Sequence, residues 1–327
     1  MTKDIPSNFA LMNTELLNQN TKLSTKSKRR LQKSKSDNTL KAYLADWNDF
    51  NYWCQTMHTN PLPATAETVV NYINDLADHA TANTIARRLS AISENHRAAG
   101  YVNDNPIISP LVKSSLAAIK REKGIVQHPK KPLLLEDLAL LEPHFAPFGI
   151  TGIRDKALLF LGFSGAFRRS ELVALTYDDL TFSSDGVTIR IKRSKSDQEG
   201  GGEMIAIPYR SNTDLCTVTA LERWLQYAPI TSGPIFRPIS KTKKVGITQL
   251  SDKSVALIVK KYTALAGLDP KRFAGHSLRR GFATSAAQHD VAERQIMKHT
   301  RHKSEKMVRR YIAEGNLFKE NALNKMF

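Results

Sequence analysis

Apolar residues recur at helical spacing through most of this 327-residue chain. Over residues 36–124 they form four runs in which one apolar position follows another after three or four residues, the period of an amphipathic helix. The segment SDN (residues 36–38) can cap the first run, and Pro110 and Gly124 begin and end the fourth. The pattern predicts a small all-helical domain over residues 36–124, and its first run supplies the core positions Leu40, Tyr43, Leu44, Trp47, Phe50 and Cys54.

The period changes once in the second half of the chain. In GVTIRIKRSK (residues 186–195), Val187, Ile189 and Ile191 alternate with polar residues, which is the spacing of a strand. The turn DQEGGGE and the returning strand EMIAIPY follow, and helical patterns lie on both sides of this hairpin. The chain is therefore predicted to be mainly α. An α+β domain with a small antiparallel β-hairpin or sheet, over residues 134–327, follows the all-helical domain.

Three further segments stand apart from these two domains. Residues 125–133 hold two prolines and little periodicity, which predicts a linker. Residues 1–35 include TKLSTKSKRRLQKSK, with seven bases and no acid, and are predicted to be a basic flexible tail that either lies on a polyanion or is solvated. After Gly315, a short terminal helix is predicted at about residues 316–327. Its apolar face docks either on its own domain or on a neighbour, and is formed by Leu317, Phe318, Leu323, Met326 and Phe327.

Composition and charge narrow the class of protein. No apolar run approaches the roughly 18 residues of a spanning helix, and the first residues lack the pattern of a secretory signal. Cys54 and Cys216 are far apart and fit no metal spacing, so we expect a cytoplasmic protein. The net charge is +17: residues 1–130 carry 17 bases and 11 acids (net +6), and residues 131–327 carry 31 bases and 20 acids (net +11). Basic charge in both halves favours a nucleic acid as partner over a membrane surface.

Attack on a DNA phosphodiester without a metal needs fixed cations for the phosphate oxygens, a nucleophile and a proton donor for the leaving oxygen. The chain offers arginines at predicted helix starts: SGAFRRSELVAL contains Arg168, and GHSLRRG contains His276 and Arg279. RHKSEKMVRRYI places His302 nine residues before Tyr311, a tyrosine that is otherwise read as a half-buried aromatic on a basic helix face.

These motifs leave two alternatives open, one for the choice of arginines and one for a metal site. Arg169 and Arg280 stand beside the chosen arginines, so a shift of one residue would select them instead. His299 and His302 are three residues apart, but no third ligand stands at a suitable spacing, so we predict no metal site.

Together these motifs resemble the tyrosine recombinase (phage integrase) family, with a layout close to its Cre-like two-domain members. The family's G-x-x-R-x-S/A-E-L pattern is matched by GAFRRSEL, its H-x-L-R by HSLR, and its His or Trp nine residues before a nucleophilic Tyr by His302 and Tyr311. Its hairpin lysine is matched by Lys195, which we prefer to Lys192 and Arg193 near the same turn. The helical half is similar to its core-binding domain. The resemblance covers roughly residues 36–327. The residue after the first arginine, Arg169, departs from the apolar residue common in the family.

The resemblance implies a role for each matched residue. Tyr311 attacks and forms a 3′-phosphotyrosyl link, while Arg168 and Arg279 clamp the scissile phosphate. His276 hydrogen-bonds that phosphate and assists proton transfer at the tyrosine, and Lys195 protonates the leaving 5′ oxygen. The remaining two are His302, which donates to a nonbridging oxygen, and Glu171, which supports the site from behind.

It also implies the partners. We expect double-stranded DNA with short inverted repeats, held between the two domains of a homo-tetramer whose free chains are monomeric or weakly associating, no membrane and no cofactor. Strand exchange would pass through a Holliday junction, in a nucleoid-associated enzyme of a prokaryote or mobile element. A DNA-binding regulator without catalysis and a type IB topoisomerase-like relaxation remain the alternatives. The predicted DNA contacts are Arg87, Arg88, Lys113, Lys120, Arg121, Arg193, Arg280 and Arg301.

Overall fold

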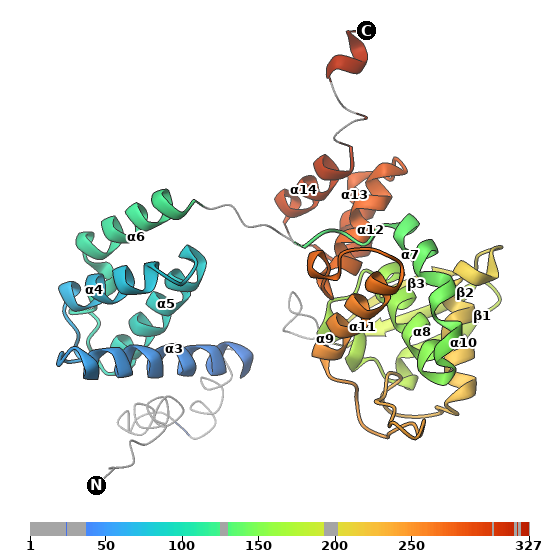
Figure 1. Ribbon diagram of the computed structural model, residues 1–327, viewed down its shortest axis with the longest axis horizontal. Coiled ribbons are helices and arrows are strands. Elements are labelled where there is room, and N and C mark those ends of the chain that lie inside the picture. The colour runs from blue at the N-terminus through green and yellow to red at the C-terminus, as the bar shows by residue number, and fades with distance from the viewer. Residues whose placement is uncertain are drawn as a thin grey trace. The chain divides into compact units, whose positions relative to one another are not determined.

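The computed structural model describes residues 24, 37–124, 130–192, 202–302, 304–316, 319 and 322–326. The chain divides into two compact units, Met1–Gln127 and His128–Phe327 (Figure 1). The predicted tail, except Ser24, lies outside the described residues, as do residues 125–129 of the predicted linker.

The first unit is all-helical, as the spacing of its apolar residues predicts. Thr65 and Thr81 begin the second and third helices, where each side chain accepts a hydrogen bond from the backbone N–H three residues later. Phe50, Ile73 and Ile92 are fully buried in its core. Its elements are α3 (Asp37–Thr56), α4 (Ala66–Ala77), α5 (Ala82–Ala98), the 3₁₀ turn η1 (Pro106–Ile108) and α6 (Pro110–Lys123).

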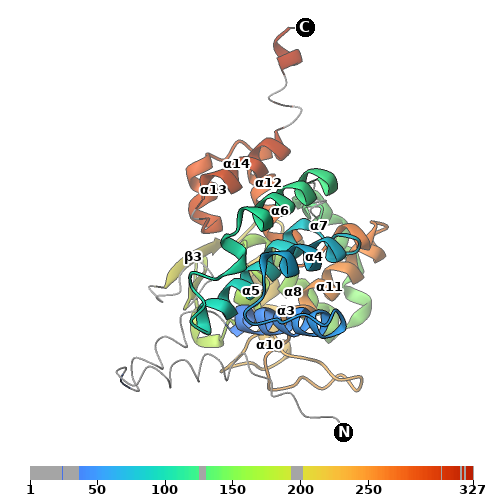
Figure 2. The ribbon, with the colours of Figure 1, turned by 90° about the vertical axis from the view of Figure 1, so that its left-hand side faces the viewer.

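The second unit combines helices with one small sheet. Its helices are α7 (Leu135–Leu141), α8 (Ile150–Ser164), α9 (Arg169–Ala174), α10 (Thr217–Tyr227), α11 (Asp252–Leu265), α12 (His276–Gln288), α13 (Glu293–Thr300) and α14 (Glu305–Gly315). Its 3₁₀ turns are η2 (Glu142–His144), η3 (Ala146–Phe148), η4 (Tyr177–Asp179), η5 (Thr213–Leu215), η6 (Pro270–Arg272) and η7 (Ala322–Lys325). The helices α12, α13 and α14 pack on one another and lie together in both views (Figures 1 and 2).

The sheet has one strand more than the sequence predicts. Three antiparallel strands are ordered β1 (Leu180–Ser183), β2 (Gly186–Ile191) and β3 (Glu203–Pro208). The predicted hairpin corresponds to β2 and β3, in which Ile189 pairs with Ile205. The missed strand β1 has only four residues, LTFS, too few to display a clear two-residue period. The predicted fold class, mainly helical with a small antiparallel sheet, is confirmed.

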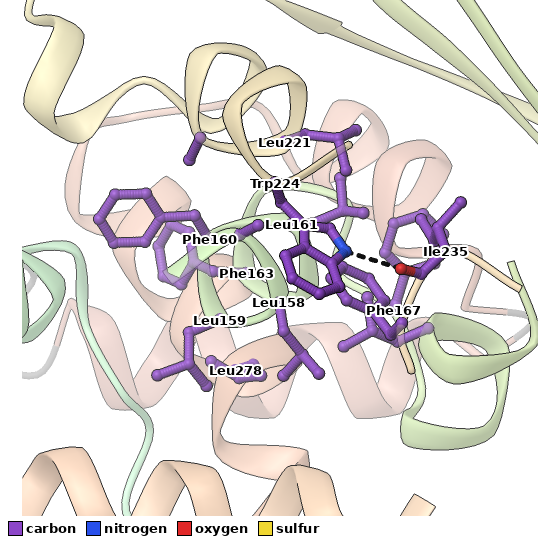
Figure 3. Packing of buried hydrophobic residues seen from close by; sticks show 14 of the residues in the cluster. Leu158, Leu159, Phe160, Leu161, Phe163, Phe167, Leu221, Trp224, Ile235 and Leu278 are labelled. Carbon is purple, nitrogen blue, oxygen red and sulfur yellow. Dashed lines mark hydrogen bonds between the residues drawn. The ribbon is translucent and has the colours of Figure 1, made fainter. Parts of the chain in front are cut away.

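The core of the second unit surrounds α8. This helix is buried nearly all round, which explains why its apolar residues follow no single stripe. Trp224 of α10 packs in the same cluster, and its indole Nε1 donates a 2.7 Å hydrogen bond to the Ile235 carbonyl (Figure 3). Leu278 of α12 joins the cluster, so the helix that carries two of the predicted site residues is anchored in this core.

Gly281 fixes how closely α12 approaches the chain at Leu133. A Cβ on Gly281 would lie 1.6 Å from the Leu133 carbonyl oxygen. We therefore expect Gly281→Ala to lower the free energy of unfolding by about 1–3 kcal/mol, although alanine normally favours a helix. Gly162→Ala is the matched control, because its Cβ would meet only the side chains of Leu172 and Leu278, which can shift. Urea unfolding of both variants tests the expectation, and an equal or smaller loss at Gly281 would contradict it.

Candidate active site

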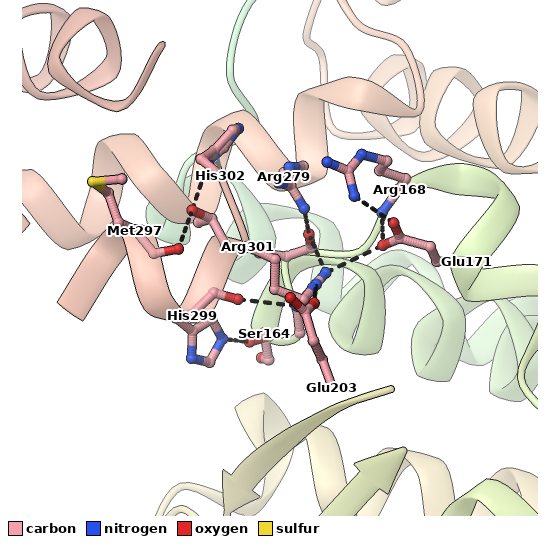
Figure 4. A network of polar contacts seen from close by, with 12 residues as sticks. Ser164, Arg168, Glu171, Glu203, Arg279, Met297, His299, Arg301 and His302 are labelled. Carbon is pink, nitrogen blue, oxygen red and sulfur yellow. Dashed lines mark hydrogen bonds and ion pairs between the residues drawn. The ribbon is translucent and has the colours of Figure 1, made fainter. Parts of the chain in front are cut away.

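Five of the six predicted catalytic residues come together in the second unit. Arg168 directly precedes α9, His276 and Arg279 lie in the first turn of α12, His302 lies between α13 and α14, and Tyr311 lies on α14. Figure 4 shows Arg168, Arg279 and His302 beside one another, and the two guanidinium charges both act on the imidazole. The rings of His302 and Tyr311 have their centroids 5.8 Å apart. The sixth residue, Lys195, and the predicted DNA contact Arg193 lie outside the described residues.

Glu171 holds Arg168 in place. The Glu171 carboxylate accepts hydrogen bonds from the Arg168 backbone N–H at 3.0 Å and from Arg168 Nη1 at 2.6 Å. Burial raises the pKa of this carboxyl, but the hydrogen bonds from Arg168 and the charges of Arg168 and Arg301 outweigh it, so the pKa is lowered. Glu171 is thus an ionised, buried anchor at the start of α9, in the supporting position that the sequence predicts.

Arg279 carries a buried positive charge with one nitrogen unused. Its Nη1 donates to the Ala166 carbonyl at 2.8 Å, while its buried Nη2 has no hydrogen-bond partner among the described residues. Burial and then the charges of Arg168 and Arg301 lower the pKa of Arg279 to about 9. A cation crowded in this way is stabilised by an anion, and a guanidinium fork suits a phosphate oxygen.

The two histidines of the site are neutral near pH 7. Burial, followed by the charges of Arg279 and Arg168, lowers the pKa of His302 to about 3. Burial among the neighbouring side chains and the charges of the nearby arginines lower the pKa of His276 to about 4, although the residue as a whole is exposed to solvent. Thr300 Oγ1 lies 2.6 Å from His302 Nδ1, so the Nε2 atom of His302 is the nitrogen left for another partner.

These two histidines predict a pH dependence of stability. Their folded pKa values lie below the ordinary value of 6.5, so the unfolded chain binds protons that the folded chain does not. Stability is retained above about pH 6.5 and falls as the pH decreases towards about 4. We expect the thermal midpoint of the DNA-free protein to drop between about pH 7.5 and about pH 5, and to drop less in His302→Gln and His276→Gln. Equal slopes in parent and variants would contradict this assignment.

Tyr311 is buried beside the arginines. It packs with Ala283, Ile296 and Val308, and the Arg280 guanidinium carbon lies 5.5 Å from its ring centre. Burial raises the pKa of Tyr311, and the opposing charges of Arg280 and Arg279 do not cancel that effect. Burial therefore outweighs the surrounding positive charge in this state. The phenol keeps its proton until a base removes it.

Two of the predicted DNA contacts, Arg280 and Arg301, are buried. Arg280 is buried and bonds the Lys130 carbonyl and the Glu314 carboxylate. Arg301 is buried as well, and its Nη1 and Nη2 atoms donate hydrogen bonds inside the unit. Neither guanidinium is presented to an external phosphate in this structure, and a contact of either one with DNA stays a prediction.

The five predicted contacts of the first unit fall into two groups. Arg87 pairs with Asp46, and Arg88 pairs with Asp49 and donates to the Tyr72 hydroxyl, so both have acidic partners within the unit. By contrast, the three predicted contacts on α6 are exposed or half-buried and have no acidic partner among the ion pairs of the described residues: Lys113, Lys120 and Arg121.

Apart from Glu171, sequence reasoning missed the residues that support the site. Thr300 orients His302, and Arg301 and the Ala166 carbonyl connect the loop before α9 to the loop before α14. Ala166 adopts a positive φ of 44°, which no sequence pattern around it announces. Among the described residues, no three His, Cys, Asp or Glu side chains gather as a metal site would require. None of the described helices has the length and apolar character to cross a membrane.

Comparisons with known proteins place the chain in a family. The profile of the Phage integrase family matches residues 142–316, and the profile "Phage integrase, N-terminal SAM-like domain" matches residues 28–99. The chain is 59% identical over 324 residues to an integrase/recombinase xerD homolog of Selenomonas ruminantium, covering 99% of this chain and 95% of that protein. It is 27% identical over 298 residues to the tyrosine recombinase XerC of Syntrophus aciditrophicus (strain SB), covering 86% and 89% respectively.

Solved structures share the fold at low sequence identity. A lambda integrase dimer bound to a COC′ core site matches with a TM-score of 0.59 and 16% identity, over 95% of this chain and 81% of that chain. The Tn1549 transposon integrase in complex with a circular intermediate DNA matches with a TM-score of 0.58 and 13% identity, over 93% and 94%. The family profile over residues 142–316 and the relative with 59% identity show that the chain belongs to the phage integrase family, the family of the tyrosine recombinases.

Proposed function

We propose that this tyrosine recombinase cleaves and rejoins DNA at a specific site through a 3′-phosphotyrosyl intermediate on Tyr311. The main support is the convergence of Arg168, Arg279, His276 and His302 near that tyrosine, with Arg279 Nη2 unused by the described protein. This arrangement concentrates positive charge and neutral N–H donors where a phosphate can bind, and it places a phenol beside them.

In the proposed cleavage step, Tyr311 Oη attacks the scissile phosphorus. A bond from phosphorus to Oη forms, and the bond from phosphorus to the 5′ oxygen of the next nucleotide breaks. The phenol proton passes to His276, whose pKa of about 4 leaves it neutral and able to accept a proton. The departing 5′ oxygen takes a proton from Lys195. One phosphodiester replaces another, so the link retains the energy needed for rejoining.

The other residues stabilise the charge that develops on the nonbridging oxygens. Arg168 and Arg279 clamp them. His302 donates from Nε2 in the tautomer in which its Nδ1 accepts a hydrogen bond from the Thr300 hydroxyl. Rejoining is the reverse reaction, with the 5′ hydroxyl of a second strand as nucleophile. Exchange of one strand pair and then the other passes through a Holliday junction.

We propose double-stranded DNA with short inverted repeats as the substrate, bound by both units. The relatives and structures matched by this chain are named as recombinases and integrases, and two of the matched structures are bound to DNA. In the first unit, which we assign to residues 36–124, the surface of α6 offers Lys113, Lys120 and Arg121 for phosphate contacts. The enzyme would act in the cytoplasm on nucleoid DNA.

We further propose that four chains assemble on DNA through the terminal segment, about residues 316–327. Leu323 is 55% exposed and Met326 is 70% exposed, which leaves apolar surface for a neighbour. An apolar cavity of about 410 Å³ between α7, α12 and α13, lined by Leu135, Phe282 and Ile296 among others, is the acceptor we assign to the neighbour's segment. Free chains would then remain monomeric or weakly associated.

A strand-exchange assay tests this proposal. DNA fragments bound by the protein are selected from a random pool, and two labelled duplexes that carry the selected site are incubated with it. We expect recombinant products, a four-way junction intermediate and a complex with the mass of four chains. Binding with no cleavage of any selected site would indicate a regulator instead. Relaxation of supercoiled DNA of any sequence by a monomer would indicate a topoisomerase.

A further inference from the structure

Arg301 occupies an unusual place between two parts of the site. It directly follows the last residue of α13 and directly precedes His302. Its backbone is in the left-handed region, with φ 57° and ψ 42°, which costs energy for any residue that has a Cβ. Its side chain is only 3% exposed, although arginine is rarely buried without partners. A strained backbone and a buried charge at one position require strong compensating contacts.

The guanidinium group supplies those contacts. Nη1 donates to the carbonyls of Gly165 and His299, each at 3.0 Å. Nη2 donates to the Ala166 carbonyl at 3.0 Å and to Glu171 Oε2 at 3.2 Å (Figure 4). The planar fork of arginine thereby bonds the loop before α9 and its own loop simultaneously, which a lysine cannot do.

These contacts reach three residues of the reaction site. The Glu171 carboxylate that bonds Arg301 also holds the backbone and the side chain of Arg168. The Ala166 carbonyl that bonds Arg301 also accepts from Arg279 Nη1. His302 is joined to Arg301 by a peptide bond, so the backbone that Arg301 fixes is the backbone that carries His302.

From this geometry we infer that Arg301 is a positioning residue for cleavage, which sets Arg168, Arg279 and His302 in register around one phosphate. The inference rests on the proposed function, because it concerns the same phosphate. Arg301 acts from behind the site: Nη1 and Nη2 are directed at carbonyls and at Glu171, Nε lies 3.5 Å from Glu203 Oε2, and we assign the residue no contact with the substrate. A displacement of about 1 Å at such a site can cost about a hundredfold in rate.

Arg301→Gly is the informative variant. It removes the guanidinium while relieving the left-handed backbone, because glycine adopts positive φ without strain. Arg301→Lys keeps the positive charge but loses the planar guanidinium group. Arg223→Ala is the matched control, because it removes an arginine charge from the exposed surface of α10. Each is measured for melting temperature, for affinity towards a selected site, and for the single-turnover rate of covalent attachment to a nicked suicide substrate.

We expect Arg301→Gly to lower the attachment rate at saturating DNA by about tenfold or more, with affinity within about twofold of the parent. Arg301→Lys should recover only a small part of the rate, and Arg223→Ala should match the parent. The double variant Arg301→Gly with Glu171→Gln should be little slower than the slower single variant, because both act through Arg168.

The outcomes separate this inference from the proposed function. A parent chain that forms no adduct contradicts the proposed function. If the parent and Arg301→Gly form the adduct at the same rate, the positioning role alone is contradicted. The positioning role is also contradicted if the rate losses of Arg301→Gly and Glu171→Gln multiply in the double variant. A readout independent of cleavage is the ¹⁵N spectrum of the arginine Nε–H groups. The signals of Arg168 and Arg279 should shift in Arg301→Gly, and unchanged signals contradict the inference.

Discussion

Replacing Tyr311 with phenylalanine is expected to abolish covalent attachment to DNA and to leave DNA binding intact. The variant loses one oxygen, the atom that we propose attacks phosphorus, so the attachment rate should fall by at least about 10⁴-fold. The ring itself packs against Ala283, Ala287, Ile296 and Val308, and phenylalanine preserves those contacts. The melting temperature should therefore stay close to that of the parent.

Tyr209→Phe is the matched control. Tyr209 is also a tyrosine of the second unit, but it is 38% exposed and its hydroxyl bonds Glu222 rather than any residue of the site. Gel electrophoresis under denaturing conditions, with a labelled suicide substrate, measures the adduct directly. If Tyr311→Phe still becomes attached to DNA at a rate near that of Tyr209→Phe, another residue is the nucleophile.

The second large effect is expected at Arg279, where activity and stability should change in opposite directions. Arg279→Met should lower the attachment rate by about 10³-fold, because it removes a fixed donor from the phosphate. The same variant should raise the melting temperature of the DNA-free protein. The buried charge of Arg279 is repelled by Arg168 and Arg301, which contributes to lowering its pKa to about 9, and methionine removes that repulsion.

The substitution also leaves its hydrogen-bond acceptor satisfied. The Ala166 carbonyl loses Arg279 Nη1 but keeps Arg301 Nη2 at 3.0 Å. Thermal melts without DNA and single-turnover attachment assays test the two halves of this prediction. A less stable variant that cleaves at the parent rate would show that Arg279 is a structural cation rather than a phosphate clamp.

Much of the fold follows from local patterns in the sequence. The helices of both units and the strands β2 and β3 have runs long enough to display their period, and capping residues such as Thr65 and Thr81 mark helix starts. The strand β1 was not predicted, because four residues are too few to display a two-residue period. The convergence of Arg168, Arg279, His302 and Tyr311 was implied by the resemblance of their motifs to a known family, and the structure supplies the contacts that bring them together.

Arg301 and Arg280 differ from their predicted exposure for one reason: the sequence shows which side chains are charged but not which of them are buried. In the basic run from Arg301 to Arg310, each arginine reads as a surface cation, but Arg301 faces inward and bonds backbone carbonyls. Arg280 is likewise turned towards Glu314 and Tyr311. The raised pKa of Tyr311 also depends on burial, since desolvation outweighs the nearby positive charge. Neither the burial of an arginine nor the shift in the pKa of a tyrosine can be predicted without knowing which side chains pack around it.

The most direct test of the account is to identify the atom that becomes bonded to DNA. The parent protein is trapped on a suicide substrate, digested with protease and nuclease, and the nucleotide-bearing peptide is sequenced by mass spectrometry. The expected product has a single modified residue, Tyr311, joined through the 3′ phosphate of the cleaved strand, with a free 5′ hydroxyl on the other side of the break. A nucleotide on any other residue, or a link through a 5′ phosphate, would contradict it.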